Sequence, residues 1–381
     1  MKITNNHLNI FKVELDHSSP YSIFVQLKNG LDEQIMNKNL CPGTKLPPID
    51  EIAKVNNVSI WTVEKAIKEL IKENVLYRRP KKGTYISDSK IRNKINSGNI
   101  SFIIREQFYF TGEPFYSIIL NSVQKELKNN GYNVVFNVID NRIVEKYQII
   151  DSLPEIFENK KIDGVIIAGS VETKLLKLLE KQKIPLVIID YDIPEDNNIN
   201  CVLIDNFNGT RMAAEYFIKL GHKRIGFIGN FKKHPSIIER INGYKYAMKK
   251  NRLNPEKFLY IGNQDDLSVD VGYMLAKKLL NKSYLPTAII CANDAMAVGT
   301  IKAIKEKGIS VPEDISVIGF DDIEWAKHTD PPLTTIKVFK EKMGEVAAEK
   351  ILKLVKGEQI APEKIKVETE LVIRNSCKSL L

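Results

Sequence analysis

Residues 311–322 read VPEDISVIGFDD, and this stretch decides the fold class. Ile315–Phe320 is an apolar run of strand length, and Asp321 follows it directly. A buried strand that ends in a polar side chain is typical of a parallel α/β sheet. In such sheets, ligands bind at the loops that follow the carboxyl ends of the strands. The stretch therefore predicts both a strand of such a sheet and a carboxylate that faces a ligand.

Six further runs share this character and alternate with segments of helix length: Ile100–Ile104, Asn133–Val138, Asp163–Ala168, Pro185–Asp190, Arg224–Gly229 and Thr287–Ala292. This alternation predicts parallel sheets with helices on both faces. Arg105, Asp190, Gly229 and Asn293 stand, like Asp321, at or just beyond the carboxyl end of a run. We expect these small or polar residues to face a polar ligand; the alternative is that the Asp and Asn residues among them cap the helices that follow.

Length and composition exclude several classes of protein. With 381 residues, 43% of them apolar, the chain can bury more than one core. We expect a cytoplasmic protein with no membrane partner, because no run of about 18 apolar residues and no export signal is present. The four cysteines are far apart, which predicts neither a zinc site nor a disulfide framework. No P-loop, Gly-x-Gly-x-x-Gly or Gly-x-Ser-x-Gly motif occurs, so we expect no enzyme and no cofactor.

The first ninety residues have a different texture and predict a helix-turn-helix. Apolar residues recur at every fourth position from Ile23 to Ile35, the pattern of an amphipathic helix. Pro47-Pro48 ends the turn after this helix and permits a second, short helix to begin. Ser59 is a good N-cap for a third helix, whose apolar positions run from Val63 to Ile71 at helical spacing.

A basic hairpin completes the predicted winged helix. Val75–Tyr77 and Thr84–Ile86 read as strands, joined by the basic loop from Arg78 to Gly83. Residues 1–90 hold 14 Lys and Arg against 10 Asp and Glu, within a chain of net charge +9, which permits a polyanionic partner. We expect the DNA contacts at Lys45, Ser59, Ile60, Trp61, Thr62, Lys65, Arg78, Arg79, Lys81, Lys82 and Gly83.

The stretch from Pro20 to Ser87 resembles the GntR family of DNA-binding domains. The segments that carry the resemblance are Val25–Leu27, Pro42–Pro47, Val58–Ser59, Thr62–Val63 and Leu76–Tyr85. Asp50, Ile60 and Glu64 stand where the family usually has arginine, the residue that reads guanine with a bidentate contact. We therefore expect an A·T-rich operator, with thymine methyl groups contacted from the third helix and the wing in a narrow minor groove. The alternative is that the three substitutions only weaken binding to the family's ordinary site.

From Asn99 to Cys377 the chain resembles the effector-binding domain of the lactose-repressor (LacI/GalR) family. Five blocks carry this resemblance: Leu220–Gly229, Glu239–Tyr244, Ala292–Ala297, Val311–Asp322 and Pro332–Ile336. It implies two Rossmann-like lobes, as in periplasmic sugar-binding proteins, with the effector in the cleft between them. It also implies the effector-binding residues, which are Glu113, Phe115, Tyr116, Asp190, Arg240, Asn293 and Asp321. Arg gives a planar fork and Asp accepts two hydroxyl groups, which suits a sugar.

Together these features predict an α/β protein with an N-terminal winged helix-turn-helix and a periplasmic-binding-protein-like domain of two lobes. The expected boundaries are residues 1–87 for the head, 88–98 for a linker, and 99–381 for an effector-binding and dimerisation domain. This order is similar to that of the AraR-like arabinose repressors. It implies a homodimeric transcriptional regulator of carbohydrate genes that binds double-stranded operator DNA and a small sugar such as a pentose. The alternative is a sugar sensor whose head has lost specific DNA binding.

Overall fold

The computed structural model describes residues 9–16, 22–37, 40–73, 75–80, 82–87, 97–105, 115–139, 162–171, 173–193, 198–230, 234–263 and 266–381. The chain divides into two compact units, Met1–Asn96 and Ser97–Leu381, with separate apolar cores. Among the described residues, no helix combines the length and the apolar character needed to cross a membrane.

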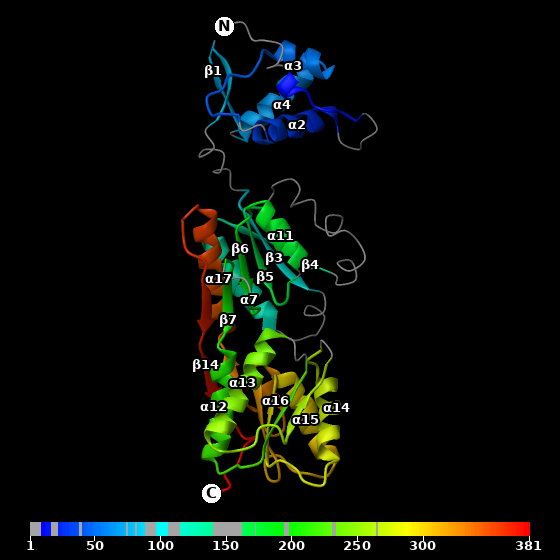
Figure 1. Cartoon of the computed structure of the whole chain (residues 1–381), viewed down its shortest axis with the longest axis vertical. Coiled ribbons are helices and arrows are strands. Elements are labelled where there is room, and N and C mark those ends of the chain that lie inside the picture. The colour runs from blue at the N-terminus through cyan, green and yellow to red at the C-terminus, as the bar shows by residue number, and fades with distance from the viewer. Residues whose placement is uncertain are drawn as a thin grey trace. The chain divides into compact units, whose positions relative to one another are not determined.

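The head is built from short helices and one hairpin (Figure 1). Its elements are η1 (Asn9–Phe11), α2 (Ile23–Asn37), α3 (Ile49–Asn56), α4 (Ile60–Lys72), β1 (Leu76–Arg79) and β2 (Gly83–Ile86). The predicted helical periodicity is confirmed, because Leu27, Leu31 and Ile35 of α2 are buried in one core with Ile67 and Leu70 of α4. The predicted helix-turn-helix followed by a hairpin is therefore the observed fold of the head.

The turn between α3 and α4 sets the direction of α4. Asn57 has a φ of 51°, the left-handed conformation that asparagine tolerates better than most residues. The Asn56 amide donates to the Phe11 carbonyl at 2.9 Å, which ties η1 to this turn. Ser59 caps α4, as predicted, since its Oγ accepts a hydrogen bond from the Thr62 N–H at 3.1 Å.

The hairpin is tighter than the sequence predicts. Arg78 pairs with Thr84 and Arg79 with Gly83, so these residues belong to the antiparallel strands rather than to the loop. The predicted basic loop from Arg78 to Gly83 is thus shortened at both ends, because Arg78, Arg79 and Gly83 take part in strand pairing. Both arginines are presented from a strand, and their positions are fixed by backbone hydrogen bonds.

The second unit contains two lobes, each with a six-stranded sheet in the part of the chain that the structure describes. The first sheet is parallel throughout and has the order β13-β7-β6-β5-β3-β4. Its strands are β3 (Asn99–Arg105), β4 (Asn133–Ile139), β5 (Gly164–Ala168), β6 (Leu186–Ile189), β7 (Asn200–Ile204) and β13 (Lys364–Val367). Its helices are α7 (Phe115–Asn129), α11 (Thr173–Lys181) and α17 (Lys340–Val355). We call this part the N-lobe.

The C-lobe has the sheet order β14-β12-β11-β10-β8-β9, in which only β14 runs antiparallel to its neighbour. Its strands are β8 (Ile225–Gly229), β9 (Leu259–Ile261), β10 (Ala288–Cys291), β11 (Ser316–Asp321), β12 (Thr334–Val338) and β14 (Thr369–Val372). Its helices are α12 (Asn206–Lys219), α13 (Pro235–Lys250), α14 (Val269–Leu280), α15 (Asp294–Glu306) and α16 (Trp325–His328).

The chain passes between the lobes at three places (Figure 1). The crossings follow β7 at Asp205, β12 at Phe339 and β13 at Glu368. Each lobe is therefore built from segments that are far apart in the sequence. All seven predicted strands of this unit are present, as β3, β4, β5, β6, β8, β10 and β11. The prediction missed β7, β9, β12, β13 and β14.

Candidate DNA-binding surface and effector cleft

The start of α4 presents two large apolar side chains to solvent. Ile60 is 56% exposed and Trp61 is 69% exposed. The Lys65 ammonium lies 3.9 Å from the centroid of the Phe24 ring of α2 and 5.3 Å from that of Trp61. A cation above an aromatic face is attracted by the ring quadrupole, so these contacts restrict Lys65. The predicted DNA contacts Trp61 and the half-buried Lys65 therefore lie together, and the exposed Ile60 directly precedes Trp61.

Glu64, which we expected to repel phosphates, has cations beside it. Its Oε1 lies 3.8 Å from the Lys68 Nζ and 4.0 Å from the Arg78 Nη1 on β1. The second pair joins α4 to the hairpin. The hydroxyl oxygens of Ser59 and Thr62 lie 2.8 Å apart and bond to each other. The polar side chains at this end of α4 thus have partners within the head.

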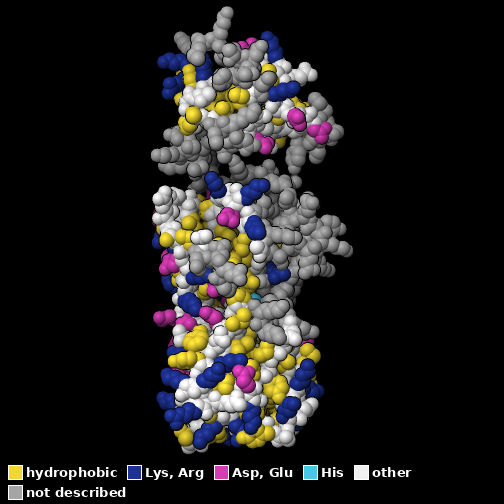
Figure 2. Space-filling model, in the orientation of Figure 1, with side chains coloured by type: hydrophobic (Ala, Val, Ile, Leu, Met, Phe, Trp, Pro, Cys, Tyr) yellow, Lys and Arg dark blue, Asp and Glu magenta, His cyan; other side chains and the backbone are white. Residues whose placement is uncertain are grey.

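The hairpin carries exposed cations on a rigid support. The Tyr77 and Tyr85 rings stack at 5.6 Å, and the Arg79 guanidinium lies 5.4 and 5.3 Å from their centroids. Gly83 has a φ of 119°, and a Cβ there would come within 2.7 Å of the Lys45 Cε, so Lys45 crosses the hairpin at this glycine. Figure 2 shows Lys and Arg side chains gathered on the side of the head where β1 lies. Lys81 lies outside the described residues.

On the N-lobe side of the cleft, Asp190 joins the two lobes. Its Oδ2 accepts a hydrogen bond from the Tyr116 hydroxyl at 3.0 Å, and its Oδ1 accepts one from the Ser236 hydroxyl on α13 at 3.4 Å. Phe115 packs edge-on against Tyr116, with ring centroids 5.0 Å apart. Burial raises the pKa of Asp190 to about 7, while the positive charge of Arg240 opposes this shift and the negative charge of Asp321 adds to it.

On the C-lobe side, Arg240 of α13 is the centre of a buried network. Its Nε donates to the Asn206 Oδ1 at 2.7 Å, its Nη1 to the Ala292 carbonyl, and its Nη2 to the Asp321 Oδ1 at 3.3 Å. The guanidinium also lies 3.7 Å from the centroid of the Phe320 ring. Burial raises the pKa of Asp321, and the positive charges of Arg240 and Lys340 oppose that shift. Arg240 is thereby held in its orientation by groups of the protein itself.

Asn293, which follows β10, has a structural role. Its Oδ1 caps α15 by accepting a hydrogen bond from the Met296 N–H at 2.9 Å, and its Nδ2 donates to the Leu267 carbonyl at 3.1 Å. The capping alternative stated for strand-end residues is confirmed at this position. Of the other predicted residues, Arg105 donates to the Ser170 hydroxyl at 2.6 Å, and Glu113 lies outside the described residues.

Two cations that support the turn at Asp321, the buried Lys340 and the half-buried Arg374, were not predicted. Lys340, at the start of α17, donates to the Asp321 carbonyl and, at 3.3 and 3.4 Å, to the carbonyls of Asp322 and Val338. Arg374 donates to the Asp322 Oδ1 at 2.7 Å. Asp321 and Asp322 have φ values of 106° and 50°, which non-glycine residues rarely adopt, and the two cations hold this turn from both sides. In the sequence both residues look like ordinary surface cations.

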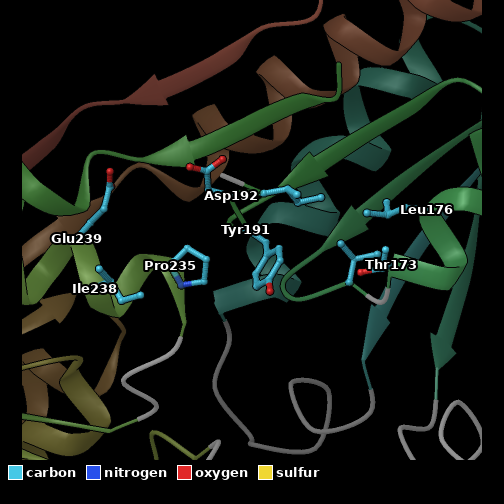
Figure 3. A pocket seen from close by; sticks show the side chains of 9 residues that line it. Thr173, Leu176, Tyr191, Asp192, Pro235, Ile238 and Glu239 are labelled. Atoms are coloured by element: carbon cyan, nitrogen blue, oxygen red, sulfur yellow. The ribbon is translucent and has the colours of Figure 1, made fainter. Parts of the chain in front are cut away.

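A pocket of about 360 Å³ is lined by residues of both lobes. Figure 3 shows Pro235 and Ile238 on one side of it, Thr173 and Leu176 on the other, and Tyr191 between them. Glu239 lines it as well and pairs with Lys366 of β13 at 2.7 Å, an ion pair that joins the C-lobe to the N-lobe. The lining residues neighbour Asp190 and Arg240 in sequence, yet they include none of the predicted effector-binding residues.

Comparison with known families identifies both units. Residues 25–86 match the bacterial regulatory proteins of the gntR family, and residues 214–377 match the periplasmic binding protein-like domain. The chain is 30% identical over 341 residues to the probable HTH-type transcriptional repressor ExuR of Bacillus subtilis, covering 87% of this chain and 98% of that protein. It is 32% identical over 350 residues to the HTH-type transcriptional repressor PurR of Haemophilus influenzae, covering 87% and 99%.

Solved structures support the same fold. The transcriptional regulator CelR in complex with cellobiose superposes with a TM-score of 0.68 at 23% identity, covering 87% of this chain and all of that one. A LacI family transcriptional regulator from Enterococcus faecium with bound ribose superposes with a TM-score of 0.63 at 26% identity, covering 74% of this chain and all of that one. These relatives are named as transcriptional repressors and regulators, not as enzymes.

Proposed function

This chain belongs to the bacterial helix-turn-helix transcriptional repressors with a periplasmic binding protein-like effector domain, and on that premise we propose that a neutral sugar controls its repression. The sugar would bind in the cleft between the two lobes. The observation that carries this proposal is the buried Arg240–Asp321 pair of the C-lobe. The charges of both residues influence the pKa of Asp190 in the N-lobe.

The charges of these side chains favour an uncharged polyhydroxy ligand. Asp190 and Asp321 can accept hydrogen bonds from hydroxyl groups, while Arg240 donates from a fixed fork. The Arg240 guanidinium is already bonded to the Asp321 carboxylate, so it offers little unpaired positive charge to an anionic ligand group. Tyr116 and Phe115 add aromatic surface that suits the apolar face of a sugar ring.

The solved relatives support the ligand class, since one holds cellobiose and another ribose. A pentose is the first ligand to test, because the order of domains resembles that of the arabinose repressors. Repression of carbohydrate genes would then be relieved or strengthened when the lobes change their angle around the bound sugar.

We also propose that the repressor acts as a homodimer on an inverted-repeat operator. A single winged helix offers few contacts for tight and specific binding, whereas a two-fold dimer doubles them. Analytical ultracentrifugation of the full chain should give a dimer at micromolar concentration with and without DNA. A monomer under both conditions would contradict this part of the proposal.

The ligand proposal is tested by thermal unfolding with a panel of pentoses, hexoses, their phosphates and purines. A ligand that binds only the native state at about 100 times its dissociation constant adds about 2.7 kcal/mol to the free energy of unfolding. We expect a neutral sugar to raise the melting temperature of the wild type and of Asp270→Asn, a change at an exposed position of α14, but not that of Asp190→Asn. Stabilisation by a phosphate or a purine alone would contradict the proposal.

A further inference from the structure

The exposed start of α4 has an unusual combination of side chains. Ile60 and Trp61 together present a large apolar surface to solvent, although isolated exposed apolar residues are common. Lys65 of α4 lies 5.3 Å from the Trp61 ring centroid, and Lys68 of α4 and Arg78 of β1 lie beside Glu64 of the same helix. Exposed apolar side chains on a helix that also carries cations fit a partner that combines negative charge with apolar groups.

The side chains that usually read bases are absent from this helix. The sequence of α4, Ile60–Lys72, contains no arginine, asparagine or glutamine, which are the common readers of guanine and adenine. Glu64 is engaged by Lys68 and Arg78, and the hydroxyls of Ser59 and Thr62 bond to each other. The groups that remain available at this end of α4 are the apolar side chains and the ammonium of Lys65.

Thymine is the base that an apolar side chain recognises, because its 5-methyl group projects into the major groove. On the premise that the head binds operator DNA, we propose that α4 reads its half-site through thymine methyl groups contacted by Ile60 and Trp61. Lys65 contacts a phosphate beside them. Phe24 is a positioning residue, because its ring lies under the Lys65 ammonium at 3.9 Å and fixes where that charge stands next to Trp61.

Charge complementarity favours DNA over a second protein surface as the partner of this patch. Lys65, Lys68, Arg78 and Arg79 lie on α4 and the adjoining strand, where Glu64 lies beside Lys68 and Arg78, and Glu69 pairs with Lys72. A protein partner would require acidic groups in the same arrangement, whereas every DNA sequence supplies phosphates at regular spacing.

The experiment selects operators for the full chain from a random DNA pool and then replaces each selected thymine by deoxyuridine. This replacement removes only the 5-methyl group. Burial of one methyl-sized group is worth about 0.8 kcal/mol, so the wild type should bind about fourfold more weakly for each contacted thymine that is replaced. The Ile60→Ala/Trp61→Ala variant should bind the thymine and deoxyuridine operators equally. Phe24→Leu should weaken binding to both operators and keep the difference between them.

A matched control is Ile373→Ala, which removes an apolar side chain that is 59% exposed in the second unit and should behave as the wild type. The proposal is overturned if the selected half-sites carry an invariant guanine under α4, or if deoxyuridine leaves wild-type binding unchanged. It is also overturned if the double variant keeps its operator affinity and loses its dimeric state, which would assign the patch to a protein contact. If the pool yields no enriched sequence, specific DNA binding by the head fails together with this inference.

Discussion

The two proposed recognition surfaces of this protein use charge in opposite settings. In the head, the Glu64 carboxylate lies 3.8 and 4.0 Å from two exposed cations, and exposed pairs of this kind contribute about 0–1 kcal/mol. In the cleft, Arg240 and Asp321 lie 3.3 Å apart with side chains only 6% and 10% exposed. Breaking a buried pair costs about 3–5 kcal/mol, because the remaining charge has no solvent. Cations of the head can therefore exchange partners for phosphates, whereas those of the cleft are fixed before ligand binding.

The largest effect is expected for Arg240→Met. The change leaves the Asp321 carboxylate without its guanidinium, so we expect the free energy of unfolding of the second unit to fall by about 3–5 kcal/mol. Response to the effector should be lost, and operator binding without effector should persist. Denaturant unfolding, calorimetry with the sugar and a DNA-binding assay measure the three quantities. Lys366→Met, which breaks the more exposed pair with Glu239, is the control. Unchanged sugar affinity in Arg240→Met would show that the cleft is wrongly assigned.

The next effect concerns the hairpin. Replacing both Arg78 and Arg79 by alanine should weaken operator binding at least tenfold at moderate salt, because two cations that can neutralise phosphates are lost. The slope of log K against log salt should fall by about 1.8, while the stability of the head should hardly change. Fluorescence anisotropy at several salt concentrations tests this. Near-normal affinity with an unchanged slope would exclude a role for the wing.

A pH dependence should distinguish the cleft from the head. Burial raises the pKa of Asp190 from 3.8 to about 7. Between these two pH values the native state holds a proton on this carboxyl group, whereas the unfolded state has released it. The stabilisation that depends on this proton is fully present below about pH 4 and is lost as the pH rises through about 7. One pKa unit corresponds to about 1.4 kcal/mol, so the loss is on the order of 2–4 kcal/mol.

The change Asp190→Asn removes this titration and should flatten the pH profile of the free energy of unfolding. Tyr116, Arg240 and Asp321 surround the carboxylate in both proteins, so the difference between the two profiles isolates Asp190. Urea unfolding at about pH 5 and about pH 8 is the measurement. Parallel profiles for the wild type and the variant would contradict the raised pKa.

The smallest effect on stability is expected for Glu64→Gln in the head. Both of its pairs are exposed, so the free energy of unfolding should change by less than about 0.5 kcal/mol. Operator affinity should nevertheless rise, because Arg78 and Lys68 lose a competing carboxylate. Anisotropy with operator DNA measures this gain, and thermal unfolding checks the stability. A decrease in affinity would mean that Glu64 itself contacts DNA, for example a cytosine amine.

The fold of the head could be predicted almost completely from local signals. Leu27 and Leu31 of α2 are buried where the period of the apolar residues places them, and Ser59 caps α4. In the second unit the long apolar runs were also found. The strands that were missed are short, such as β9 (Leu259–Ile261), or resemble loop sequence, such as β13 (Lys364–Val367), and they are stabilised by pairing with distant strands.

The sequence by itself determined the two-unit organisation, the helix-turn-helix, the strand ends at which Asp190 and Asp321 stand, and the cationic character of the hairpin. Only the tertiary structure decided which side chains form hydrogen bonds with one another. Lys340 and Arg374 support the turn of Asp321 from positions 19 and 52 residues away from their acceptors, and Asp190 meets Ser236 across the lobes. Hydrogen bonds between residues distant in sequence depend on how the chain crosses between the lobes and on which side chains become buried. Neither of these produces a periodic pattern in the sequence.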